Sequence, residues 1–243
     1  MAGGIGFAAA FRRHFGGRQT GTTSALLVFP LFLVYQLAIL LGARGRNGAD
    51  FITFALILLC DRDFPSYALL IGSLGVLYAG VLLTLGERRV PALRLFWPTL
   101  LESAVYASLM GLAIQLAIAY FDRLVPILAF GSGPLDVLAI SAGAGLHEEL
   151  VFRSGLLAGL IRLLSLPRFG LGRLAGSLAA LLASSLVFAL VHHVGPGQEP
   201  FTLVAFVYRT LAGAIFGVIY LYRGLGVAAW THALYDVLVL LGR

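Results

Sequence analysis

Residues 134–160 read PLDVLAISAGAGLHEELVFRSGLLAGL, a stretch long enough and apolar enough to cross a membrane as a helix. The stretch nevertheless carries two adjacent glutamates, Glu148 and Glu149, and an arginine, Arg153. A charged side chain inside a membrane helix costs about 2.5–3.5 kcal/mol on insertion scales, so such residues usually serve a function. The sequence therefore predicts a membrane-spanning helix that carries a functional site.

The whole chain has the composition of an integral membrane protein. Of its 243 residues, 60% are hydrophobic and 12% are charged, and the mean hydropathy is +0.96. A soluble domain carries about 25% charged residues. The apolar runs are continuous and as long as helices, unlike the short alternating strands of a transmembrane β-barrel. We therefore predict an all-α, polytopic membrane helical bundle.

About seven transmembrane helices are expected, within a range of six to eight. The expected spans are 23–43, 66–86, 98–121, 134–160, 177–194, 200–222 and 225–241. Residues 51–60 are too short to span and are expected to form a half-helix, an interfacial helix or part of an eighth span. Residues 196–200 (PGQEP) are expected to form a short turn between helices. We expect residues 1–22 to be a cytoplasmic or interfacial segment, and residues 23–243 to be one transmembrane domain with a catalytic core in about 98–243.

The chain is basic, with a formal net charge of +6 and a pI of about 9.9, and all its basic side chains except histidine are arginines. In a membrane protein such charge is expected in cytoplasmic loops, so no nucleic-acid partner is expected. With seven spans, one side of the membrane, taken as cytoplasmic, receives Arg12, Arg13, Arg18, Arg88, Arg89, Arg94, Arg162, Arg168, Arg173 and Arg223. The opposite side receives Arg44, Arg46, Arg123 and Arg243.

The two adjacent glutamates are expected to have different roles. On an α-helix, Glu148 and Glu149 point about 100° apart. Glu149 and Arg153 are spaced i,i+4 and can form an ion pair. Glu148 then lacks a local cation and is a candidate general base. The alternative is that both glutamates belong to an ion-pair network between helices.

Two further polar groups end or interrupt apolar spans downstream. His192 and His193 end one span, and because adjacent residues diverge, at most one should face a site in the core. His192 follows Phe188 by four residues, so the two rings share a stripe. His232 and Asp236 share a face of the last helix, where the carboxylate can orient the imidazole. Each group alone could also be structural.

Other polar or aromatic side chains in the apolar spans are weaker candidates for the functional site. Gln115 and Arg209 are candidates for lining a cavity, whereas Trp230 and Tyr235 are expected to be packing or interface aromatics. The single cysteine, Cys60, excludes an intrachain disulfide and a cysteine-based metal site.

A glutamate and two histidines on three helices leave two chemistries open. Zinc accepts His/His/Glu ligation in catalytic sites. A metal-free hydrolase could instead use the glutamate as base and the histidines as acid and oxyanion stabiliser. The chain lacks an HExxH helix, the strong local signal of a zinc hydrolase.

Three motifs of the chain resemble those of the CAAX-protease and bacteriocin-processing (CPBP, or Abi) family of intramembrane glutamic endopeptidases. The family motif EExxxR is matched by 148–153 (EELVFR), FxxxH by 188–192 (FALVH), and HxxxN or HxxxD by 232–236 (HALYD). The three motifs occur in the family's order. The resemblance covers roughly residues 98–243.

The resemblance implies a glutamate-dependent protease that needs no metal or other cofactor. Glu148 would activate the attacking water with help from His192, and His232 and Asp236 would stabilise the oxyanion. Glu149, Arg153 and Phe188 would support the site.

Asp236 departs from the asparagine that the family's prenyl-protein endopeptidases usually carry. An ionised aspartate cannot donate a hydrogen bond. Asp236 is therefore either protonated or accepts a hydrogen bond from His232, and we favour the second reading.

The resemblance also implies the partners: a membrane protein or peptide cleaved near its C-terminal or membrane-anchored segment, and the lipid bilayer. The arginine bias suggests a bacterial protein of the inner (cell) membrane, and the chain resembles the myxosortases among the bacterial members of the family. The alternatives are a non-catalytic scaffold or bacteriocin self-immunity protein, a zinc-dependent peptidase, and a small transporter that relays protons through its ionisable residues.

Overall fold

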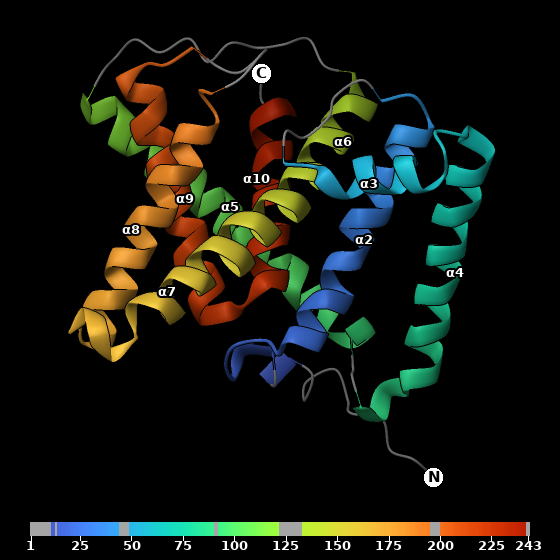
Figure 1. Ribbon diagram of the computed structural model, residues 1–243, viewed down its shortest axis with the longest axis horizontal. Helices are drawn as coiled ribbons and strands as arrows, with labels where there is room; N and C mark the ends of the chain where they lie inside the picture. Colours follow the sequence, from blue (N-terminus) through green and yellow to red (C-terminus); the bar gives the residue numbers. More distant parts are fainter. Residues whose placement is uncertain are drawn as a thin grey trace.

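The structure is a computed structural model that describes residues 11–12, 14–43, 49–89, 92–121, 133–194 and 200–241, without the side chains of 84–89, 92–93 and 118–121. Within these residues all regular elements are helices, so the predicted all-α bundle is confirmed (Figure 1). The elements are α2 (Gly21–Leu40), α3 (Phe51–Leu59), α4 (Phe64–Arg89), α5 (Ala92–Phe121), α6 (Pro134–Gly143), the π-helix η1 (Ala144–Leu157), α7 (Ala158–Leu164), the 3-10 turn η2 (Pro167–Phe169), α8 (Arg173–Val191), α9 (Leu203–Arg223) and α10 (Leu225–Leu241).

Five described helices are long and apolar enough to cross a membrane: α2, α4, α5, α8 and α9. The helix α10 is apolar but shorter. A sixth long unit runs without a break through α6, η1 and α7, with charged side chains at its centre. These units follow the order of the predicted spans, and the chain is an integral membrane protein.

The described arginines assigned to the cytoplasmic side belong to segments at one end of the bundle, whereas Arg62 lies between α3 and α4, and Arg153 and Arg209 lie within helices. The start of α2, the end of α7, the start of α8 and the end of α9 all lie at the lower end in Figure 1. The side expected to be cytoplasmic is therefore one physical face. The predicted turn at 196–199, Arg13, Arg44, Arg46, Arg123 and Arg243 lie outside the described residues, as do the side chains of Arg88 and Arg89.

The short apolar stretch after α2 forms α3, which lies across the direction of α2 (Figure 1). The Asp50 side chain caps α3 by accepting a hydrogen bond from the backbone N–H of Thr53 at 2.8 Å. The chain then turns through positive φ at Asp61 and Arg62 before α4 begins. The turn separates α3 from α4, so the eighth-span option is wrong and the short-helix option holds.

The last helix, α10, lies in the middle of the bundle, where it packs against α2, α5, α6, η1 and α9 (Figure 1). Its contact with η1 depends on Gly145. A Cβ atom there would lie 2.5 Å from the carbonyl oxygen of Ala229 and 2.8 Å from Cβ of Ala233. The absent side chain lets the two helices that carry the polar residues approach each other.

Two pairs of glycines at i,i+4 spacing, Gly155/Gly159 and Gly213/Gly217, differ in whether they pack against a neighbouring helix. At Gly213 and Gly217 an added Cβ would press against α8, as the spacing predicts. At Gly155 it would meet only the backbone of its own helix at 3.5 Å, and at Gly159 it would meet nothing within 4 Å. Gly155 and Gly159 therefore face away from neighbouring helices, although their spacing is one that favours close helix packing.

The contact at Gly145 gives a stability prediction. Gly145→Ala should lower the free energy of unfolding by about 1–3 kcal/mol, because overpacking forces η1 and α10 apart. Gly159→Ala is the matched control and should be neutral or stabilise by about 0.5–1 kcal/mol, since alanine favours the helix. Denaturation of both variants in detergent micelles checks this, and equal effects would contradict the close approach.

Candidate active site

The acidic motif lies on a π-helix rather than on the α-helix expected over 134–160. From Ala144 to Leu157 the backbone bonds run i to i+5, so each turn holds more residues than an α-turn. Such segments occur frequently at functional sites. Here η1 is buried along most of its length, including both glutamates and Arg153. The polar side chains therefore point into the bundle rather than toward lipid.

The predicted pair of Glu149 and Arg153 is confirmed. The Nε atom of Arg153 lies 3.1 Å from Oε2 of Glu149, and both side chains are fully buried. The Arg153 guanidinium also donates to the carbonyl of Gly213 at 3.3 Å. It lies over the Phe188 ring at 4.4 Å and near the Phe216 ring at 5.5 Å. Ring faces and a carboxylate thus replace the water that the charge has lost.

The structure also brings Glu148, His192 and His232 together. Oε2 of Glu148 lies 3.6 Å from Nε2 of His192 and 3.9 Å from Nε2 of His232. The Glu148 side chain is 11% exposed and that of His192 is 17% exposed, whereas Glu149 is fully buried. Of the two adjacent glutamates, Glu148 is therefore the one with some exposed side-chain surface.

The ring orientation of His192 follows from its place at the C-terminal end of α8. Its Nδ1 lies 2.7 Å from the carbonyl oxygen of Phe188, which can only accept, so Nδ1 carries the hydrogen. The Phe188 ring packs on the imidazole with centroids 4.7 Å apart. Nε2 is thereby aimed at Glu148.

The partner that orients His232 is Glu149, not Asp236. Nδ1 of His232 donates to Oε1 of Glu149 at 2.8 Å, and the imidazole stacks on Phe216 at 4.2 Å. Oδ2 of Asp236 lies 3.8 Å from Nε2 of His232, which is beyond hydrogen-bond distance. The prediction that Asp236 accepts a hydrogen bond from His232 is therefore wrong. Because η1 packs closely against α10, Glu149 is the carboxylate within hydrogen-bond distance of the His232 ring.

The remaining predicted residues lie around or away from this cluster. The ring of His193 packs against Phe201 at 5.3 Å, so only one of the adjacent histidines faces the site. Gln115 is exposed on α5 and does not line the site. The indole of Trp230 donates to the carbonyl of Leu27 at 2.7 Å, a packing role as predicted.

A second polar contact beside the site was not predicted. Nε2 of His147 lies 3.0 Å from Oδ1 of Asp50, and its Nδ1 lies 3.0 Å from the carbonyl oxygen of Gly143. Tyr35 donates to Oδ2 of Asp50 at 2.6 Å. Burial raises the pKa of Asp50, but the hydrogen bonds from His147 and Tyr35 outweigh it and lower the pKa to about 2. The ionised Asp50 therefore ties the loop before α3 to the residue that precedes Glu148.

Glu102 on α5 is a buried carboxylate that was also missed. It accepts from Nε of Arg223 at 2.6 Å and contacts Nε2 of His14 at 2.5 Å. Arg223 also donates to the carbonyls of His14 and Gly17. This cluster fixes the segment before α2 against α5 and α9. The only sequence signal for it was a single glutamate within an apolar span.

The helices that carry the polar cluster lie in the part of the chain that matches a known protein family. Residues 130–238 match the family model described as Rce1-like, type II CAAX prenyl endopeptidase. Over these residues, which are less than half of the chain, the protein is similar to the Rce1-like family. The Rce1-like segment includes η1, α8 and α10, and with them Glu148, His192, His232 and Asp236. Neither a curated protein nor a solved structure matches the chain.

The Rce1-like match begins later than the resemblance expected from residue 98. Helices α2 to α5 lie before it, yet they contact the segment through Asp50 and through the packing of α2 and α5 on α10. The similarity to the Rce1-like family is thus a similarity to CAAX-type endopeptidases. Among the described residues, no group of three or more histidine, cysteine or acidic side chains is arranged to hold a metal ion.

Proposed function

We propose that this protein is an intramembrane endopeptidase whose attacking water is activated by Glu148. It cleaves a membrane-associated protein or peptide near its C-terminal or membrane-anchored segment, in the cell membrane of a bacterium. The observation that carries the proposal is the division between the glutamates. Glu149 is held by Arg153 and His232, whereas Glu148 is partly exposed beside two imidazoles.

Glu148 and His192 are placed to share the water. Their facing atoms are 3.6 Å apart, so one water can lie ~2.6–3.2 Å from both. Because Nδ1 of His192 carries its hydrogen, Nε2 can accept one water hydrogen while Glu148 accepts the other. As the water oxygen bonds to the scissile carbonyl carbon, its proton moves to Glu148. Glu148 then delivers that proton to the leaving nitrogen as the C–N bond breaks.

His232 is placed to stabilise the developing oxyanion. Its Nδ1 hydrogen is used by Glu149, so Nε2 can donate only when the ring is an imidazolium. The carboxylates of Glu148, Glu149 and Asp236 all lie within 4 Å of the ring nitrogens and favour that charged form. A charged donor aimed at an oxyanion in a water-poor site is a strong source of catalysis.

Substitutions of Asp236 distinguish two roles for this residue: an ionised carboxylate that catalysis requires, or a position where an amide can replace it. Asp236→Asn should retain most of the cleavage rate, because Glu149 still orients His232 and the amide adds N–H donors where the family's asparagine donates. Asp236→Ala, which supplies no polar group, should be slower than Asp236→Asn. Initial cleavage rates of both variants in liposomes check this. Abolished activity in Asp236→Asn alone would show that the ionised carboxylate is required.

The proposed function is tested with purified protein reconstituted into liposomes that contain a library of lipid-anchored peptides. Mass spectrometry should detect internal cleavage of some peptides, at the same rate with and without a strong zinc chelator. Loss of cleavage with the chelator and its return with added zinc would establish the zinc-dependent alternative. An intact library would favour the non-catalytic scaffold.

A further inference from the structure

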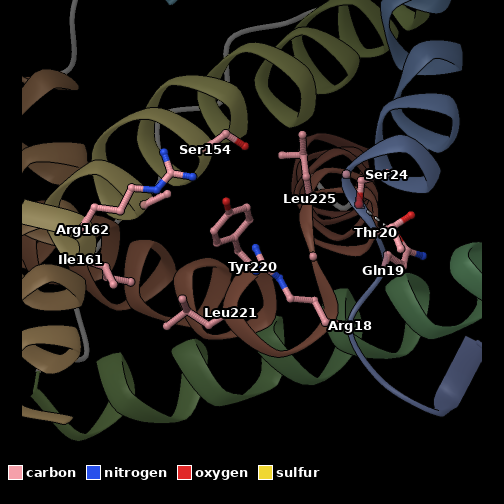
Figure 2. Close-up of a pocket in the computed structure, with 13 residues that line it drawn as sticks. Arg18, Gln19, Thr20, Ser24, Ser154, Ile161, Arg162, Tyr220, Leu221 and Leu225 are labelled. Carbon is pink, nitrogen blue, oxygen red and sulfur yellow. Dashed lines mark hydrogen bonds between the residues drawn. The ribbon is translucent and has the colours of Figure 1, made fainter. Parts of the chain in front are cut away.

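A pocket with two arginines in its lining lies at the end of the bundle where α2 begins and α9 ends. Its volume is about 550 Å³, within the range of about 300–1,000 Å³ that ligand sites usually have. It opens between the start of α2, the end of α7 and the junction of α9 with α10 (Figure 2). The lining comprises Arg18, Gln19, Thr20, Gly21, Ser24, Ser154, Ala158, Ile161, Arg162, Tyr220, Leu221, Gly224 and Leu225.

The charge of this pocket is positive and uncompensated. Figure 2 shows the guanidinium groups of Arg18 and Arg162 extending toward the same space, beside the hydroxyls of Tyr220 and Ser154. None of the lining residues is acidic. Within the described part of the chain, neither arginine forms an ion pair with a carboxylate. The pocket therefore presents two cations and hydroxyl donors to an anion.

Arg18 is held in place by its neighbours in sequence. The carbonyl of Gly17 accepts from Nη1 of Arg223 at 2.6 Å, and the backbone N–H of Gln19 donates to the carbonyl of Arg223 at 3.0 Å. The Arg18 guanidinium itself lies over the Tyr220 ring, 4.8 Å from its centroid. The side chain is thus positioned before any ligand arrives, which lowers the entropic cost of binding. The N-terminus of α2 adds a favourable dipole at the same wall.

Part of the pocket lining is apolar. Ile161, Leu221 and Leu225 line the pocket next to the arginines. An inorganic anion has no apolar part that could pack against these side chains. A phospholipid has both a charged headgroup and the start of its acyl chains. Basic pockets between membrane helices on the cytoplasmic side are suited to anionic lipid headgroups.

We propose that this pocket binds the phosphodiester headgroup of an anionic phospholipid. Arg18 and Arg162 contact the phosphate oxygens through charge-assisted hydrogen bonds, and the Tyr220 hydroxyl adds a donor. The acyl chains leave along Leu221 and Leu225. A bound lipid would then join α2, α7 and α9 at this end of the bundle. The site is independent of the proposed peptidase activity.

The test uses the full-length protein in vesicles of phosphatidylcholine with and without phosphatidylglycerol, followed by native mass spectrometry. The wild type should retain phosphatidylglycerol over phosphatidylcholine, and the double variant Arg18→Gln, Arg162→Gln should lose at least tenfold of that preference. The matched control is Arg168→Gln at the same end of the bundle, whose guanidinium lies over Phe169 and does not line the pocket. The control should retain the lipid as the wild type does.

Two outcomes would overturn the proposal. One is equal retention of phosphatidylglycerol by the wild type and the double variant. The other is displacement of the lipid by millimolar inorganic phosphate, which would show a free-phosphate site. The second arm uses only the wild type, so it decides the matter even if the double variant is unstable.

Discussion

Replacing Glu148 with glutamine should lower the rate of peptide cleavage by about 100- to 10,000-fold, the range that general base catalysis usually contributes. Glutamine keeps the size of the side chain but cannot take a proton from water. Since glutamine has the same shape and the Glu148 side chain is 11% exposed beside the imidazoles of His192 and His232, the fold should remain intact. Initial cleavage rates in liposomes, measured beside thermal unfolding in detergent, check both parts.

The two adjacent histidines supply a matched control for the same assay. His192→Ala should also lose activity, because Nε2 of His192 faces Glu148. His193→Ala should keep it, because the ring of His193 packs on Phe201 instead. Equal losses of activity in both variants would mean that cleavage requires an intact end of α8 rather than the His192 imidazole.

Replacing Arg153 with methionine should destabilise the protein by about 3–5 kcal/mol, the usual cost of leaving one partner of a buried ion pair without the other. The Glu149 carboxylate would stay buried with His232 as its remaining charged neighbour. The double variant Glu149→Gln, Arg153→Met should be less destabilised than Arg153→Met, because it buries no uncompensated charge.

Denaturation of the single and double variants in detergent measures this coupling. Arg168→Met is the control: its side chain is exposed, so the free energy of unfolding should change by no more than about 0.5 kcal/mol. Simple additivity of the Glu149→Gln and Arg153→Met effects would contradict a direct pair.

The sequence predicted the bundle and the main members of the site for physical reasons. Helix-length apolar runs leave few alternatives to membrane helices, and charge within them must serve some purpose. The Glu149–Arg153 pair was predictable because both residues belong to one helix. The convergence of Glu148 with His192 and His232 was predictable only through the family resemblance, since no local pattern relates three different helices.

The parts that sequence reasoning missed are all contacts between distant segments. The hydrogen bond between Glu149 and His232 joins residues 83 positions apart, and the pair of His14 and Glu102 joins residues 88 positions apart. The π-helical backbone of η1 has no simple sequence signature, so the site helix was expected to be an α-helix. Asp236 was assigned to His232 by spacing, although Glu149 is the carboxylate hydrogen-bonded to that ring, at Nδ1, and Asp236 lies 3.8 Å from Nε2.

Glycine spacing shows the same limit. Gly155 and Gly159 have the spacing of a close helix contact but face away from other helices, whereas Gly145 has no such partner and touches α10 most closely. Spacing identifies residues on one face of a helix, but only the packing decides which face meets a neighbour.

The most direct measurement for the role of Glu148 is chemical rescue of Glu148→Ala with a small carboxylate. Cleavage of the lipid-anchored peptides by this variant is measured with sodium formate and with sodium chloride at equal ionic strength. The account predicts that the variant is inactive in chloride and partly recovers in formate, because formate replaces the missing base. Cleavage by Glu148→Ala at the wild-type rate without formate would contradict the assignment of Glu148 as the base.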